Sequence, residues 1–340
     1  MLTTVAIIGS GFGMYCLLPA FSKIKGCKVV SICGKNSPRM GNLCKKFQIQ
    51  KYNNWKEMLQ KEKPDAVAIA VIPKHQFEIA KYALENGISV FAEKPLSMNY
   101  QDSFELSELA KKHQLPNVVD FEFPEIPEWE ETKQIIENDT IGKISLVNVN
   151  WNFLSYDLSH EIKSWKTDVE QGGGAISLVL SHTFHYLEFF LGVITDIKST
   201  ISSSEKSLNN GDTTIKMTLL FENGCKGTVN LDISDSNNQT HSLKFHGENG
   251  ILMLQNTSDS FVDNFELILI RNNEEKKIIP KKSLNLSEQP GEDDRIKVVN
   301  SLATKFINWC KFDNPARPNF QDGLRVQKLI ELLRNSNSII

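Results

Sequence analysis

One lysine of this chain lies where a protein could use it to move a proton. Lys94 follows the apolar run of residues 88–92 and precedes Pro95. Such a run predicts a parallel strand covered on both faces, and ligands bind at the carboxyl ends of such strands. Pro95 disfavours helical geometry at Lys94, and burial would lower the pKa of the amine toward neutrality. Lys94 is therefore a candidate acid–base residue, although an isolated Lys-Pro pair can also simply begin a surface loop.

A glycine-rich turn near the start of the chain predicts a second chemical feature. The apolar residues 5–8 lead into Gly9, Gly11, Phe12 and Gly13, and a helical pattern follows. Gly9 permits a tight turn, Gly11 permits close approach of a pyrophosphate, and the helix amino terminus attracts its charge. The third glycine is at Gly13, with Met14 in its usual place, so the pattern departs from GxGxxG. We expect these residues to bind a dinucleotide; a tight strand–helix turn without a ligand is the alternative.

The end of the second predicted strand bears on which dinucleotide is bound. NAD sites usually place Asp or Glu there, whereas this chain has Gly34 and Lys35, with Arg39 beyond them. A 2′-phosphate would be attracted by Lys35 or Arg39. We therefore expect NADP in preference to NAD, although a lysine near a ribose can also have no role.

The first 120 residues alternate between strand and helix patterns, which predicts a doubly wound parallel sheet. The predicted strands are residues 4–9, 28–33, 66–71, 88–93 and 117–120. The predicted helices are residues 14–25, 38–47, 55–62, 75–86 and 100–112.

The second half predicts an α+β domain with a large, mostly antiparallel open sheet. Its predicted strands are residues 144–152, 194–202, 213–221, 227–233, 241–246, 251–255 and 265–271. Its predicted helices are residues 129–138, 175–191, 296–312 and 323–335. We expect a dinucleotide-binding Rossmann domain at residues 1–122 and a domain for substrate binding and oligomerisation at residues 123–340.

The composition excludes several classes of partner. The formal net charge is -3 in 340 residues, which gives no field for nucleic acid or an anionic membrane. The six cysteines form no CxxC pair, and no metal-binding constellation is present. No run approaches the length of a membrane helix. We expect a cytoplasmic protein with small-molecule partners.

Taken together, these motifs resemble the Gfo/Idh/MocA oxidoreductase family, the glucose-fructose oxidoreductase and inositol dehydrogenase group. The matching stretches are residues 9–21, 64–81, 93–95 (EKP), 142–143, 172–192 and 317–318. The resemblance implies a Rossmann domain, a nicotinamide near Lys94, and a homo-oligomer, dimer or tetramer. It also implies hydride transfer to or from a secondary alcohol or carbonyl of a sugar, polyol or nucleotide sugar.

The resemblance implies a second catalytic residue on the helix after the glycine run. Family members carry an Asp followed four residues later by a His. Here the histidine is His182, but Leu178 occupies the aspartate position. The acid–base work would fall on Lys94 and His182, with His185 as a further candidate; either histidine could instead be packed inside an amphipathic helix.

The resemblance adds further binding candidates. Pro73, Gln76 and Glu93 would contact the cofactor, together with Lys94. Trp165 and Lys166 would border the substrate, or lie on the surface. Glu122 could reach the cleft or act as a hinge residue.

Three functions are therefore open at this stage. The first is an NAD(P)-dependent dehydrogenase or reductase. The second is a glycosidase or epimerase that recycles a bound cofactor. The third is a non-catalytic, nucleotide-binding regulatory homologue, which the loss of the aspartate at position 178 suggests.

Overall fold

The chain folds into two compact units, each of which draws on two segments of sequence. The computed structural model describes residues 2–205, 207, 211–235, 237, 239–284, 286 and 291–335. The first unit comprises Met1–Glu122 with Asn285–Lys328, and the second comprises Phe123–Leu284 with Leu329–Ile340. Residues 285–328 thus pack with the first unit, whereas the expected functional domains, 1–122 and 123–340, remain predictions.

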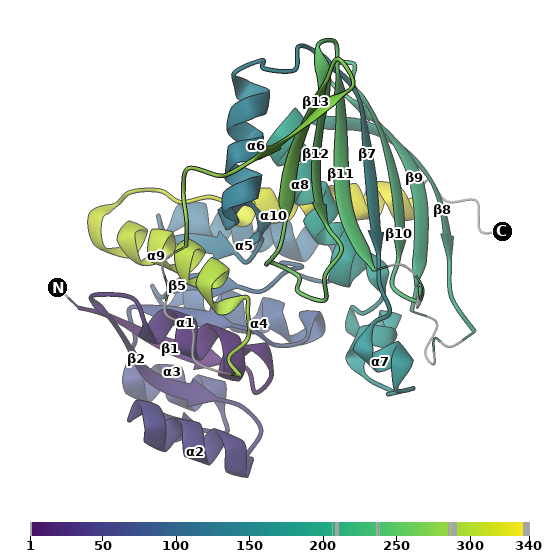
Figure 1. The fold of residues 1–340 in the computed structure, drawn as a ribbon. Helices are drawn as coiled ribbons and strands as arrows, with labels where there is room; N and C mark the ends of the chain where they lie inside the picture. The colour runs from purple at the N-terminus through teal and green to yellow at the C-terminus, as the bar shows by residue number, and fades with distance from the viewer. Residues whose placement is uncertain are drawn as a thin grey trace. The chain divides into compact units, whose positions relative to one another are not determined.

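The first unit contains a six-stranded parallel sheet (Figure 1). The strand order is β3-β2-β1-β4-β5-β6. The strands are β1 (Thr3–Ile8), β2 (Cys27–Cys33), β3 (Gln50–Tyr52), β4 (Ala66–Ile69), β5 (Ser89–Ala92) and β6 (Asn117–Val119). The connecting helices are η1 (Gly13–Leu17), α1 (Leu18–Ser22), α2 (Pro38–Phe47), α3 (Trp55–Glu62), α4 (Pro73–Glu85) and α5 (Tyr100–Lys112). Because β1 lies between β2 and β4, the strand order reverses there, and such a reversal is where doubly wound folds bind ligands.

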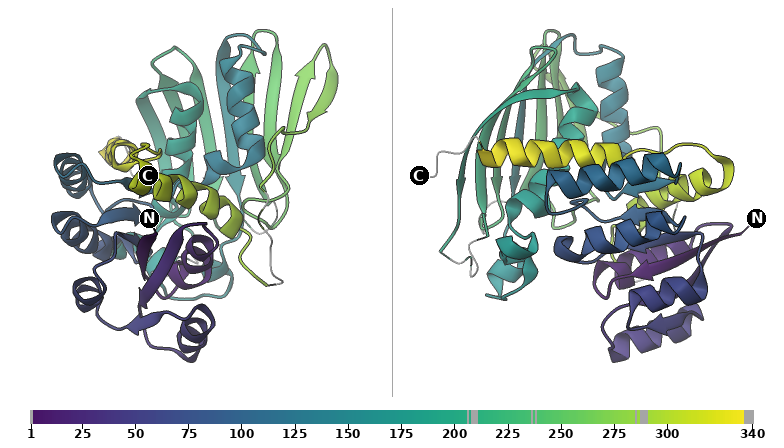
Figure 2. Two further views of the ribbon diagram at one scale, coloured as in Figure 1. Left: turned by 90° about the vertical axis from the view of Figure 1, so that its left-hand side faces the viewer. Right: turned by 180° about the vertical axis from the view of Figure 1, so that it is seen from behind.

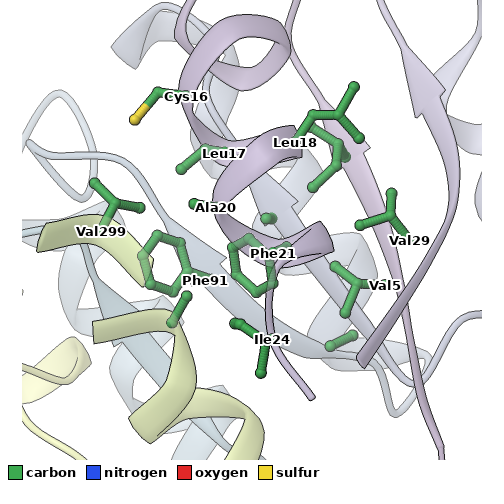
Figure 3. Packing of buried hydrophobic residues seen from close by; sticks show 14 of the residues in the cluster. Val5, Cys16, Leu17, Leu18, Ala20, Phe21, Ile24, Val29, Phe91 and Val299 are labelled. Atoms are coloured by element: carbon green, nitrogen blue, oxygen red, sulfur yellow. The ribbon is translucent and has the colours of Figure 1, made fainter. Parts of the chain in front are cut away.

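The core of the first unit joins the two segments of sequence. Figure 3 shows Phe21, Phe91 and Val299 among its labelled apolar side chains. The ring centroids of Phe21 and Phe91 are 5.3 Å apart, and Phe306 lies 5.8 Å from Phe91. Val299 and Phe306 belong to α9 (Ile296–Phe312) and are fully buried. The C-terminal segment therefore completes the hydrophobic core of the nucleotide-binding fold.

Local capping explains why several predicted helices have the observed bounds. Ser37 accepts a hydrogen bond from the Met40 amide, and Asn54 accepts one from the Glu57 amide. These side chains satisfy free N–H groups at the starts of α2 and α3. The helix predicted at residues 14–25 is also present, but it begins with a π-helical turn, η1, and α1 ends at Ser22, three residues earlier than predicted.

The second unit is built on an eight-stranded sheet of order β14-β13-β12-β11-β7-β10-β9-β8. Only β7 and β10 are parallel neighbours. The strands are β7 (Ile144–Asn152), β8 (Ile194–Ser202), β9 (Thr214–Phe221), β10 (Lys226–Asp232), β11 (Thr240–Gly247), β12 (Gly250–Asn256), β13 (Glu266–Arg271) and β14 (Glu274–Ile278). Side chains of β9 alternate between buried and exposed, so this part of the sheet has one covered face.

Two helices cover that sheet on one face, as Figure 2 shows. They are α6 (Pro127–Glu137) and α8 (Ser181–Leu191), the latter preceded by the π-helical turn η5 (Ile176–Leu180). Phe190 of α8 packs against Phe245 of β11, with ring centroids 5.3 Å apart. Trp129 of α6 packs against Phe265, at 5.4 Å. The expected helix at residues 175–191 is therefore present, but its first turn is π-helical.

The remaining elements are short or lie near the C-terminus. They are η2 (Phe123–Glu125), α7 (Tyr156–Ser159), η3 (Trp165–Thr167), η4 (Val169–Gln171) and α10 (Phe320–Asn335). None of the helices in the described part of the chain is long and apolar enough to cross a membrane. The predicted fold class, a parallel Rossmann sheet followed by a largely antiparallel sheet, is confirmed.

Candidate active site

The glycine-rich turn after β1 has the backbone that a bound phosphate requires. Gly9 has φ +138°, and a Cβ there would lie 2.1 Å from the carbonyl oxygen of Ala70. Gly13 packs close to β1 and β4, with a Cβ position 3.4 Å from Ile7. A Cβ at Gly11 would meet no atom within 4 Å, so the outer side of the turn is open to a ligand. The turn therefore fits the pyrophosphate of a dinucleotide, with the N–H groups of the following helix facing it.

An arginine from the C-terminal segment lies over this turn. The Arg295 guanidinium carbon is 4.7 Å from the ring centroid of Phe12. Asp293 accepts two hydrogen bonds from Arg295, one from Nε at 2.8 Å and one from Nη2 at 2.6 Å. This ion pair fixes a partly buried positive charge beside the glycine-rich turn, where phosphate oxygens would gain from it.

The carboxyl end of β2 has no carboxylate and no space for one. A Cβ at Gly34 would lie 2.9 Å from the Ser10 Cβ and 2.9 Å from the Met40 Cε. Lys35 and Arg39 are exposed beside it, and the Arg39 guanidinium lies 5.7 Å from the ring centroid of Tyr15. Lys35 and Arg39 therefore supply positive charge at this end of the sheet.

Lys94 lies among carboxyl groups at the carboxyl ends of β5 and β6. Burial lowers the pKa of the Lys94 amine, while the charges of Glu93 and Glu122 oppose that shift. Burial and the neighbouring Glu93 raise the pKa of Glu122 to about 7, against the effect of Lys94. Burial raises the pKa of Glu93, and burial with Glu93 raises that of Asp120 well above its usual range. The structure thus brings together Glu93, Lys94 and Glu122. It lowers the pKa of Lys94 and raises that of Glu122, the directions that acid–base work near neutral pH requires.

Gln76 holds the backbone on both sides of Lys94. It is 1% exposed, and its Nε2 lies 2.5 Å from the Glu93 oxygen, 2.9 Å from the Pro95 oxygen and 3.2 Å from the Leu96 oxygen. The Lys94–Pro95 peptide is cis. Pro73 is the first residue of α4, the helix that also contains Gln76. In the described contacts, Gln76 holds the backbone turn at Lys94. The expected contacts of Gln76 and Pro73 with a cofactor remain predictions.

In the second unit, the glycine run supports the loop that contains Trp165 and Lys166. The Gly174 amide donates to the Lys166 oxygen at 2.8 Å, and a Cβ at Gly173 would lie 2.0 Å from the Trp165 oxygen. The Lys166 Nζ lies 3.3 Å from Asp157 Oδ1. Glycines at 173 and 174 are therefore required to seat this loop against the start of η5.

A distant aspartate caps the helix that follows the glycine run. Asp212 accepts a hydrogen bond from the Ile176 amide at 2.7 Å, and its main-chain oxygen accepts one from Ala175 at 2.8 Å. At Gly174 (φ +90°), a Cβ would lie 2.4 Å from Asp212 Oδ1. The carboxylate thus satisfies a first-turn N–H of the helix that carries His182.

His182 lies within an aromatic cluster of the second unit. It is 5% exposed, and its ring centroid lies 5.0 Å from that of Phe123 and 6.4 Å from that of Trp151. His185 and Leu178 are only partly buried. His182 and His185 are three residues apart on one helix and share a face. Since Lys94 belongs to the first unit, the catalytic pairing of Lys94 with His182 remains a prediction.

Sequence reasoning missed the roles of three residues described above. Asp120 was assigned only to a strand end, Arg295 precedes a helix far along the chain, and Asp212 lies 36 residues from the amide that it caps. Only the tertiary structure brings each of them beside its partner.

Comparisons with known proteins agree with this arrangement. The model of an oxidoreductase family with an NAD-binding Rossmann fold matches residues 3–121, and that of an oxidoreductase C-terminal alpha/beta domain matches residues 133–338. An uncharacterised oxidoreductase of Synechocystis sp. is 28% identical over 263 residues, which are 74% of this chain and 71% of that protein.

Solved structures share the fold over nearly the whole chain. Levoglucosan dehydrogenase in complex with NADH superposes with a TM-score of 0.83 at 18% identity, covering 99% of this chain and 97% of that one. The WlbA dehydrogenase from Bordetella pertussis, in complex with NADH and UDP-GlcNAcA, gives 0.81 at 17% identity, covering 99% and 96%. At such identities the similarity shows the fold alone.

Proposed function

Because this chain belongs to the Gfo/Idh/MocA family of oxidoreductases, we propose that it transfers a hydride between a nicotinamide cofactor and a secondary alcohol or carbonyl. The family resemblance inferred from the sequence is confirmed by both family matches. The proposed substrate is a sugar, polyol or nucleotide sugar. The observation that supports this proposal is the partly buried Lys94 at a strand end, beside an open glycine-rich turn.

The nicotinamide would supply the hydride chemistry, and the protein would handle the proton. Lys94, as the neutral amine, accepts the proton of a substrate hydroxyl during oxidation; as the ammonium, it donates that proton to the carbonyl oxygen during reduction. Burial lowers the pKa of the Lys94 amine and so favours its neutral form, while the charges of Glu93 and Glu122 oppose that shift. His182 of the second unit is the second proposed acid–base residue.

We propose NADP as the preferred cofactor. A carboxylate at position 34 would repel a 2′-phosphate, but Gly34 provides none, and its closeness to Ser10 and Met40 would oppose one. Lys35 and Arg39 supply positive charge at the same strand end. Replacing Lys35 with alanine should weaken NADPH binding by about tenfold, the order expected of one charge-assisted phosphate contact, while NADH binding changes little.

The second unit would bind the substrate and join copies of the chain. Trp165, Lys166 and His185 are the proposed substrate contacts. The face of the sheet that carries the exposed residues of β9 is the proposed surface of a homo-oligomer, in a cytoplasmic protein.

Cofactor binding and turnover test the proposal separately. Titration of NADPH and NADH, followed by quenching of tryptophan fluorescence, should give saturable binding. A panel of sugars, cyclitols and nucleotide sugars should then change the absorbance of the bound cofactor. Lys94→Ala should bind cofactor but lose turnover, with Lys74→Ala, an exposed lysine on α4, as the matched control.

Two results would count against the proposal. Absence of nicotinamide binding would remove the oxidoreductase function. Binding without turnover on any substrate, with wild type and Lys94→Ala indistinguishable, would instead favour the regulatory homologue that Leu178 suggests.

A further inference from the structure

Two carboxyl side chains, those of Glu93 and Asp120, meet at the carboxyl end of the parallel sheet. The Asp120 amide donates to the Ala92 oxygen at 2.8 Å, so Glu93 and Asp120 directly follow neighbouring strands β5 and β6. Asp120 is 1% exposed, and neither of its carboxyl oxygens accepts a hydrogen bond from any donor in the described part of the chain. Its side chain instead faces the carboxyl of Glu93.

A hydrogen bond between two carboxyl groups requires a proton on one of them, because two carboxylates can only accept. Two ionised carboxylates in contact inside a protein would also repel each other strongly. Burial together with Glu93 accordingly raises the pKa of Asp120.

The charged groups around Glu93 and Asp120 also favour protonation of one of these two carboxyls. The basic groups are Lys94 and Arg295, and Arg295 already pairs with Asp293. Glu122 is a third carboxyl close to Lys94. The Cys16 thiol is also nearby, but burial raises its pKa and it carries no charge. If all three carboxyls were ionised, three buried negative charges would face Lys94 and an Arg295 that is already shared with Asp293.

We propose that Asp120 and Glu93 share one proton near neutral pH, and that Asp120 is thereby a positioning residue for Lys94. The shared proton leaves one negative charge on the pair rather than two. The lowered pKa of the Lys94 amine is then preserved, since a second carboxylate would favour its ammonium form. This inference relies on the proposed function only in taking Lys94 as the acid–base residue.

Infrared spectroscopy of the protein without cofactor tests the proton directly. In a Glu122→Gln background, which removes the other carboxyl that titrates near pH 7, we expect a carboxylic acid C=O stretch at pH 7 that shifts in D₂O. Asp120→Asn should remove that band. Asp157→Asn is the matched control, because Asp157 is also buried but accepts hydrogen bonds from Ser164 and Lys166, and it should leave the band unchanged.

A second measurement reports the protonation state of the Lys94 amine. The rate of amine acylation at Lys94, followed by peptide mass spectrometry at pH 8, increases as the amine loses its proton. Glu122→Gln removes an ionised carboxylate at that pH and should increase the rate severalfold. Asp120→Asn replaces a carboxyl that is already neutral and should change it by less than twofold.

The outcomes separate the inference from the proposed function. A band that persists in Asp120→Asn, or an increase in Lys94 acylation as large as that of Glu122→Gln, would overturn the shared proton. If Asp120→Asn fails to fold, Glu93→Gln in the same background must remove the band for the inference to stand. Failure of the protein to bind a nicotinamide would refute the function but would leave both readouts of the proton valid.

Discussion

Replacing Gly9 with alanine should destabilise the first unit, for reasons that the backbone makes specific. The residue has φ +138°, and the new Cβ would lie 2.1 Å from the Ala70 oxygen. The strained backbone costs about 1–3 kcal/mol for a non-glycine residue. Relief of the clash must move β1 from β4 and weaken the hydrogen bond from Ala70 to Ile8, now 2.7 Å, which adds about 1 kcal/mol. We expect a loss of about 3 kcal/mol in the free energy of unfolding.

Gly11 in the same turn provides the matched control. Its Cβ position is open, and its φ lies outside the left-handed region. Gly11→Ala should therefore leave the free energy of unfolding unchanged or raise it by about 0.5 kcal/mol, since alanine restricts the unfolded chain. The added methyl group would instead occupy the open side of the turn and weaken nicotinamide binding by tenfold or more.

Thermal unfolding and hydrogen exchange distinguish the two effects. A loss of about 3 kcal/mol lowers the melting temperature of a unit of this size by roughly 6–12 °C. Exchange of the amides in β1 should accelerate in Gly9→Ala and not in Gly11→Ala. If the two variants are equally destabilised, or if Gly9→Ala is as stable as the wild type, the reasoning from the Ala70 contact is wrong.

Three further predictions follow from the charged residues. Lys94→Ala should lower turnover by about 10²–10⁴-fold with little change in cofactor affinity, measured by steady-state kinetics once a substrate is found. Asp212→Ala should cost about 1–2 kcal/mol of stability and accelerate amide exchange in η5, because the Ile176 amide loses its buried acceptor. Glu122 has a folded-state pKa of about 7, above its ordinary 4.5, so the folded protein binds its proton more tightly. The free energy of unfolding should therefore decrease between pH 4.5 and pH 7 because of Glu122. Urea unfolding of Glu122→Gln should show a smaller decrease over the same range.

Much of the fold was predictable because the local signals agree with the tertiary structure. The predicted helices at residues 38–47, 55–62 and 100–112 and the strand at 144–152 have the observed bounds. The capping residues Ser37 and Asn54 directly precede the first residues of two of those helices. The short strand β3 and the charged strand β14 were missed, because three or five largely polar residues show no hydrophobic alternation.

The candidate site was predictable where its chemistry lies next to a local pattern. Gly9 follows an apolar strand, and Lys94 ends one, so both could be selected from their neighbours. Asp120 also ends a strand, but only the pairing of β5 with β6 shows that its carboxyl meets that of Glu93. Arg295 lies beside Phe12 through contacts between residues far apart in sequence, and no periodicity encodes such a contact.

The return of the C-terminal segment to the first unit affects how the protein is made. On the ribosome, residues 1–122 emerge long before α9, and until then Phe21 and Phe91 lack Val299 and Phe306. The nascent Rossmann sheet therefore has an apolar face uncovered while residues 123–284, most of the second unit, are synthesised. Chaperones that bind exposed apolar surface would therefore have their longest opportunity on this face, and the dinucleotide site would become complete only after Arg295 has left the ribosome.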